Sequence, residues 1–250
     1  MIEEPFAIGQ SWIHRIDPRS KIIFAAIYST AVAVSSGFPT LTVSFGFSIL
    51  LIGLARLNLT AVFKRLSVVL GFIVLIWITL PLTTEGDSLI DIGSLTLSVQ
   101  GIHLSARITI KSMTILITLM ALIATMTIPT LGHSLNRLHV PGKIVQLLVL
   151  TYRYIFVFED EYQRLLRAAK VRGFRPGTNI HSYKTYAYLI GMLLVRAWAR
   201  AERVHQAMRC RGFKGKFYAL ERFPSGPQNR VFVTSMTFLV AVLVFLEWYL

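Results

Sequence analysis

The residues best suited to contact a partner are two arginines in a repeated motif. Residues 168–175, AAKVRGFR, match residues 207–214, AMRCRGFK, as A-x-(basic)-x-R-G-F-(basic). Each copy ends a long helical pattern, so Arg172 and Arg211 should precede a glycine that stops a helix. An arginine beside a phenylalanine offers a planar charged fork and an apolar side chain, which anchor well in a partner's pocket. Two copies suit a partner with two-fold symmetry.

General helix chemistry explains part of this repeat. Basic residues in a last turn offset the helix dipole, and glycine commonly follows a helix. That explanation does not cover the repeated alanine, the phenylalanine or the basic residue after it, so the sequence favours a paired docking element. Its residues are Val171, Arg172, Gly173 and Phe174 in the first copy and Cys210, Arg211, Gly212 and Phe213 in the second.

Catalytic and metal-binding residues are harder to find. The 6 histidines are scattered without the H-x-x-x-H spacing of a helical metal site, and no G-x-x-x-x-G-K-[ST] sequence is present to hold ATP. The acidic run 159–161 is expected to begin a helix, where its charge favours the helix dipole. We therefore expect no catalytic residue, no metal site and no cofactor on this chain.

The helices that carry the two arginines must belong to a membrane protein. The chain has 250 residues, 54% hydrophobic and 15% charged, against roughly 25% charged in a soluble domain. Its apolar runs predict an all-α fold, a polytopic helical membrane protein with about five transmembrane helices and a pair of long amphipathic helices. The first expected span is 18–36, with Asp17 as its cap and Pro18 in its first turn. The other expected spans are the run from the break at 36–39 to residue 55, then 66–84, 112–136 and 231–246. The apolar stretches 144–158 and 186–195 are too short to assign as spans, so the side of the C-terminus stays open.

Charge predicts how the chain is oriented. The net charge is +14, and residues 130–230 contain 18 basic and 5 acidic side chains. By the positive-inside rule the N-terminus and this region are cytoplasmic. The expected organisation is residues 1–129 with four transmembrane helices, 130–230 as a cytoplasmic helical region, and 231–250 as the last transmembrane helix. Nucleic acid is not needed as a partner to explain the positive charge.

One basic pair lies on the other side of this predicted topology. Arg107 and Lys111, four residues apart, are expected to reach lipid headgroups or to pair with acids of the outer loop 83–102. Those acids are Glu85, Asp87 and Asp91. We do not expect a role in substrate binding for the pair.

The duplicated Arg-Gly motif, the start HRIDPRSK at residues 14–21 and the chain length resemble the transmembrane T component of energy-coupling-factor transporters, cobalt type (the CbiQ/EcfT family). In that family two X-Arg-Gly motifs, commonly Ala-Arg-Gly, lie on coupling helices and dock into two ATP-binding-cassette ATPase subunits. The motifs fall here on 171–173 and 210–212, with Val171 and Cys210 in place of alanine.

This resemblance implies a non-catalytic subunit of a plasma-membrane importer, with ATP hydrolysis on the partner ATPases. It also implies a separate substrate-binding membrane subunit, with room for a small accessory membrane subunit. Cobalt is the cargo that the resemblance favours, and nickel or a vitamin stays open as an alternative. A further alternative is a membrane scaffold whose basic residues, such as Arg196, Arg200 and Arg203, bind anionic lipid. An intramembrane enzyme would need paired acids or histidines beside the spans, which the sequence lacks.

Overall fold

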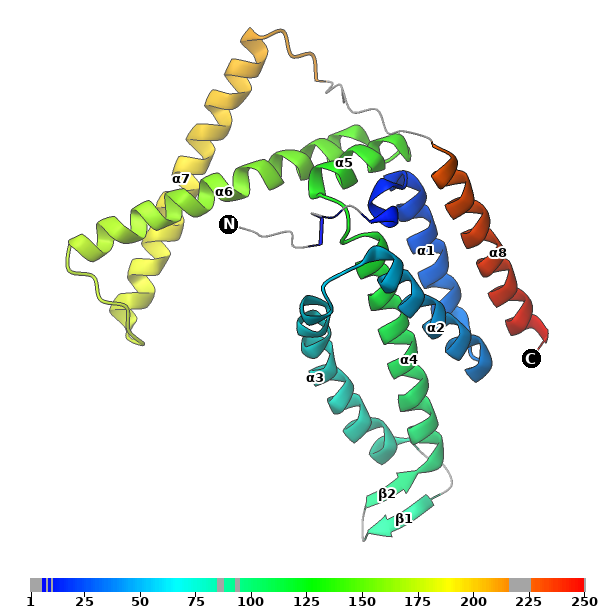
Figure 1. Cartoon of the computed structure of the whole chain (residues 1–250). Helices are drawn as coiled ribbons and strands as arrows, with labels where there is room; N and C mark the ends of the chain where they lie inside the picture. Colours follow the sequence, from blue (N-terminus) through cyan, green and yellow to red (C-terminus); the bar gives the residue numbers. More distant parts are fainter. Residues whose placement is uncertain are drawn as a thin grey trace. The chain divides into compact units, whose positions relative to one another are not determined.

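The computed structural model describes residues 6–7, 9, 11–84, 88–92, 95–215 and 226–249, and these are mostly helical (Figure 1). In chain order the elements are η1 (Trp12–Arg15), α1 (Pro18–Val34), α2 (Phe38–Ala55), α3 (Leu59–Thr83), β1 (Ser88–Ile92), β2 (Leu95–Ser98), α4 (Val99–Leu122), α5 (Ile128–Arg137), α6 (Gly142–Val171), α7 (Ile180–Cys210) and α8 (Pro227–Tyr249). The two strands form a short antiparallel hairpin within the predicted outer loop.

Four of the described helices are long and apolar enough to cross a membrane: α2, α3, α4 and α8, with 18, 25, 24 and 23 residues. The predicted polytopic helical membrane protein is thereby confirmed. The fifth expected span forms α1, which has 17 residues and is therefore about 25 Å long, close to the lower limit for a span. Neither α6 nor α7 meets the length and composition of a span.

Helix boundaries follow the local signals where those are strong. Asp17 caps α1 by accepting a hydrogen bond from the backbone N–H of Arg19, and Pro18 occupies the first turn. In contrast, α4 begins at Val99, 13 residues before the predicted start. That prediction required a charge-free run, but Arg107 and Lys111 are part of the helix and find partners within the fold.

The chain divides into two compact units, one of residues 132–215 and one of residues 6–131 and 226–249. In the second unit α4 packs against α1, α2 and α3, and α8 packs against α1 and α2. Fully or nearly fully buried apolar side chains hold this packing together, among them Ile13, Leu51, Ala121 and Phe232. In the first unit α6 and α7 cross one another (Figure 1).

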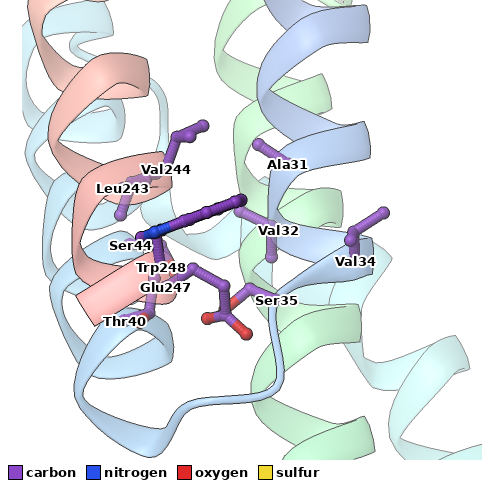
Figure 2. Close-up of a pocket in the computed structure, with 10 residues that line it drawn as sticks. All are labelled: Ala31, Val32, Val34, Ser35, Thr40, Ser44, Leu243, Val244, Glu247 and Trp248. Carbon is purple, nitrogen blue, oxygen red and sulfur yellow. The ribbon is translucent and has the colours of Figure 1, made fainter. Parts of the chain in front are cut away.

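The turn between α1 and α2 is held by charged side chains from two other helices. Glu247 of α8 accepts hydrogen bonds from the Ser35 hydroxyl at 2.8 Å and from the Ser36 backbone N–H at 2.7 Å; Figure 2 shows Glu247 beside Ser35, next to a mostly apolar pocket. Lys111 of α4 donates to the carbonyl oxygen of Ala33 at 2.7 Å. The carboxylate therefore lies at the positive end of α2 and the ammonium at the negative end of α1, where each is favoured.

The second member of the basic pair stacks on an aromatic ring. The guanidinium carbon of Arg107 lies 5.5 Å from the centre of the Phe38 ring, within cation–π range. Of the acids expected to pair with Arg107 and Lys111, Glu85 and Asp87 lie outside the described residues, and the side chain of Asp91 is not described. The contacts that the structure does show are with α1 and α2.

Candidate docking site at two helix ends

The first motif closes α6 with two backbone hydrogen bonds. The N–H of Phe174 donates to the carbonyl of Ala169 at 3.1 Å, and the N–H of Gly173 donates to that of Lys170 at 3.0 Å. Gly173 has φ +86°, a left-handed conformation that glycine adopts without the penalty of a Cβ. This pair of bonds around a left-handed glycine is the Schellman motif.

The second motif closes α7 in the same way. The N–H of Phe213 donates to Met208 at 3.0 Å, the N–H of Gly212 donates to Arg209 at 3.0 Å, and Gly212 has φ +78°. In a Schellman motif an apolar residue after the glycine commonly contacts the last helical turn. Helix termination therefore explains the repeated phenylalanine as well as the glycine, which the sequence pattern alone had not indicated.

The first helix end presents an arginine and a valine outward. Val171 is 89% exposed, and Arg172 and Gly173 are exposed. Phe174 is only 9% exposed, and its ring meets that of Tyr186 edge-on at 5.5 Å between centroids. Phe174 therefore secures the helix end against α7 and is not exposed as the predicted apolar docking side chain, and Val171 is the exposed apolar side chain at this end.

The second helix end is more open. Cys210, Arg211 and Gly212 are all exposed, and Cys210 is a free thiol. Phe213 is half-buried. The two copies thus share their backbone geometry and the exposure of the Arg-Gly pair, while the first is packed more tightly against neighbouring residues.

An ion pair joins α6 to α7 where they cross. Arg196 of α7 donates a hydrogen bond to Glu161 of α6, whose other carboxylate oxygen lies 3.9 Å from Arg164. The hydrogen bond from Arg196 lowers the pKa of the Glu161 carboxyl below its ordinary value of 4.5. The expectation that residues 159–161 begin a helix is wrong, because no glycine or proline interrupts the helix that starts at Gly142 and α6 continues through them.

Each helix continues beyond the ion pair as a segment, here called an arm, that ends in a motif. Arg172 follows Glu161 by 11 positions and Arg211 follows Arg196 by 15 positions. At 1.5 Å per helical residue the arms reach roughly 16 Å and roughly 22 Å beyond the ion pair. The sequence did not reveal Glu161 and Arg196 as a pair, because opposite charges occur at many positions of these helices.

Metal chemistry has no support within the described residues, where no group of three or more histidine, cysteine, aspartate or glutamate side chains could hold an ion. What the described geometry offers is two exposed Arg-Gly helix ends on one crossed pair. The sequence profile of the family CbiQ, described as "Cobalt transport protein", matches residues 9–220, a range that includes both motifs. The chain belongs to this family. The family resemblance seen in the sequence is thereby confirmed, and the CbiQ-family chain is a multi-pass protein of the cell membrane.

Curated relatives with one shared name are similar over most of their length. A Brevibacillus brevis protein is 29% identical over 220 residues, covering 83% of this chain and 82% of the relative. A Listeria innocua protein is 26% identical over 226 residues, covering 86% and 85%. A Leuconostoc gelidum protein is 28% identical over 222 residues, covering 84% and 82%. Each is named "Energy-coupling factor transporter transmembrane protein EcfT".

Proposed function

We propose that this CbiQ-family chain is the transmembrane coupling subunit of an energy-coupling-factor importer, and that its two helix ends dock onto two ATPase subunits, one end on each. The name of the curated relatives supports the role in the transporter. The observation that carries the docking proposal is the pair of exposed Arg-Gly ends closed by the same backbone hydrogen bonds. Two ends with the same backbone geometry suit two ATPase subunits of similar shape.

The crossed helices are suited to transmit motion. Arg172 and Arg211, each seated in an ATPase, would move together when the ATPases close on ATP. The hydrogen bond between Glu161 and Arg196 joins α6 to α7 where they cross. Displacement of either Arg-Gly end would therefore rotate the two helices together. The chain itself contains no P-loop sequence to bind ATP. The energy of ATP hydrolysis on the partner ATPases would therefore reach the membrane through α6 and α7.

A separate membrane subunit would receive this motion and hold the substrate. In support, α7 leaves large apolar side chains exposed, including Tyr188 at 75%, Leu194 at 69% and Trp198 at 76%. Large apolar side chains exposed together on one helix mark a surface that a partner covers. We propose cobalt as the cargo because the family is described as a cobalt transport protein, and uptake of labelled cobalt, nickel and vitamins by the assembled transporter separates these cargoes.

The docking proposal is tested with the double variant Arg172→Ala/Arg211→Ala, co-expressed with both ATPases and the substrate-binding subunit. An arginine that becomes buried in an interface contributes about 2 kcal/mol or more to the binding free energy. Loss of each arginine should therefore weaken the contact with its ATPase roughly 30-fold or more. The ATPases should be lost on purification of the tagged chain, and ATP-driven uptake should stop.

The motif provides its own control. Arg175 and Lys214 occupy the basic position after the phenylalanine in each copy and are also exposed, so Arg175→Ala/Lys214→Ala removes the same charge three residues away. This variant should keep both ATPases. If the Arg172/Arg211 variant kept assembly and uptake, or if both double variants lost the ATPases equally, the Arg-Gly ends would not be the docking elements.

A further inference from the structure

A pocket at the opposite end of the second unit from Glu247 brings together two arginines that the coupling role does not use. It has a volume of about 450 Å³, and its lining includes Trp12 and Arg15 of η1, Leu54 and Arg56 at the end of α2, and Gln228 at the start of α8. Its lining residues come from three separate segments of the chain. The fold of this unit, rather than any local sequence motif, therefore creates the pocket.

The backbone fixes the position of both arginines. Arg15 lies between Ile13 and Ile16, which are 0% and 1% exposed. These buried side chains hold η1 in place. Arg56 has φ +49° and ends α2 with its N–H bonded to the carbonyl of Gly53. A left-handed conformation is uncommon for a residue with a side chain. The fold therefore fixes the backbone position from which each arginine side chain extends.

The pocket carries positive charge without a described counter-charge. Both arginine side chains are exposed, and within the part of the chain that the structure describes no carboxylate lies within 4.0 Å of either. The first turn of α8 adds backbone N–H groups and the positive end of a 23-residue helix. This combination favours an anionic ligand, and a guanidinium fork matches a phosphate in particular.

The position of the pocket at the ends of two candidate spans indicates the source of that phosphate. Both α2 and α8 are membrane-spanning by length and composition, and the pocket lies where α2 ends and α8 begins. Trp12 is half-buried and packs edge-on against Phe232, as expected of an aromatic at the membrane interface. Leu54 and Leu50, one turn apart on α2, are 43% and 53% exposed and continue the pocket as an apolar surface suited to an acyl chain.

We infer that this pocket binds the phosphate headgroup of one anionic phospholipid, of the phosphatidylglycerol class, with its acyl chain along α2. A zwitterionic lipid would bring an ammonium for which the described pocket offers no carboxylate. The bound lipid would join η1, α2 and α8 at one point. This site is separate from the Arg-Gly ends, so the inference does not depend on the proposed function.

The inference is tested on the full chain, purified and delipidated in detergent and titrated with dioleoyl phosphatidylglycerol or dioleoyl phosphatidylcholine. Native mass spectrometry counts the lipids bound. Arg15→Gln/Arg56→Gln should bind phosphatidylglycerol roughly 30-fold more weakly, corresponding to about 1 kcal/mol for each arginine. The unaltered chain should bind phosphatidylcholine more weakly than phosphatidylglycerol.

Two variants separate a built site from general surface charge. Lys64→Gln/Arg153→Gln removes the same charge from exposed residues of α3 and α6 that do not line the pocket, and it should bind phosphatidylglycerol like the unaltered chain. Arg15→Lys/Arg56→Lys keeps the charge but loses the forked donors, so its affinity should be intermediate. A melting temperature close to that of the unaltered chain shows that each variant is folded.

Three results would overturn the inference. Equal losses in the Arg15/Arg56 and Lys64/Arg153 glutamine variants would show only a general attraction to positive charge. Equal affinities for phosphatidylglycerol and phosphatidylcholine would show that the pocket does not select a headgroup with a net negative charge. Displacement of the lipid by millimolar inorganic phosphate would show a site for the free anion instead of the lipid headgroup.

Discussion

Replacing either motif glycine with alanine should loosen its helix end. Gly173 and Gly212 have φ +86° and φ +78°, and a left-handed conformation costs an alanine about 1–2 kcal/mol. No neighbouring heavy atom lies within 4 Å of the position that a Cβ would take at either glycine. The cost therefore comes from the backbone alone and should be nearly equal at the two ends.

The same substitution within α7 should have the opposite sign. Gly191 lies in the middle of α7, and the position that its Cβ would take also has no neighbouring heavy atom within 4 Å. Alanine is favoured over glycine inside a helix by about 0.5–1 kcal/mol, so Gly191→Ala should stabilise α7. Gly173→Asn should cost less than Gly173→Ala, because asparagine adopts the left-handed conformation more readily.

Hydrogen exchange measured by mass spectrometry on the purified chain tests these signs. The N–H groups of Gly173 and Phe174, and of Gly212 and Phe213, donate the bonds that close the two helices. A loss of about 1–2 kcal/mol raises the rate of their opening about 5- to 30-fold, while the middle of α6 should keep its protection. The glycine geometry would be refuted if Gly173→Ala and Gly191→Ala changed exchange in the same direction, or if alanine and asparagine at 173 gave the same rate.

Two further predictions concern carboxylates that join separate helices. The pKa of Glu161 is lowered by its arginine partner from the ordinary 4.5, so the stability from this pair is present above about pH 4.5 and is lost as the pH falls through the lowered pKa. The melting temperature of Glu161→Gln should therefore lie below that of the unaltered chain at pH 7 and converge with it in acid; a constant difference would contradict the pairing. Glu247→Ala leaves the Ser36 N–H and the Ser35 hydroxyl without their acceptor, at a cost of about 1–3 kcal/mol. The melting temperature should fall by about 2–4 °C for each kcal/mol, whereas Glu202→Ala, on the exposed surface of α7, should change nothing.

Much of the fold could be predicted from local patterns. Apolar runs identified α2, α3 and α8 as spans, and the Asp17–Pro18 pair located the start of α1. These predictions succeed because the length of a span and the capping of a helix both depend on residues that are close together in the sequence. The start of α4 was missed because Arg107 and Lys111 were treated as the end of an apolar span, whereas a helix accommodates charges that find partners in the fold.

The two helix ends of the candidate site were predictable from the sequence, but the contacts of their side chains were not. The repeat placed Arg172 and Arg211 before left-handed glycines, because helix termination depends on only a few adjacent residues. It did not indicate that Phe174 would be buried against Tyr186 of the next helix. A lone acid near the end of an apolar span, such as Glu247, is a signal in the sequence that could have indicated a polar contact between helices.

The sequence by itself determined that the chain is a membrane protein with two similar Arg-Gly helix ends. Only the tertiary structure decided that Glu161 meets Arg196, 35 positions away, that Glu247 secures a turn 211 positions earlier, and that the arginines of two segments line one pocket. Local patterns specify where a helix begins and ends. Contacts between distant residues depend on how the helices pack, and that is settled by the whole set of buried side chains together.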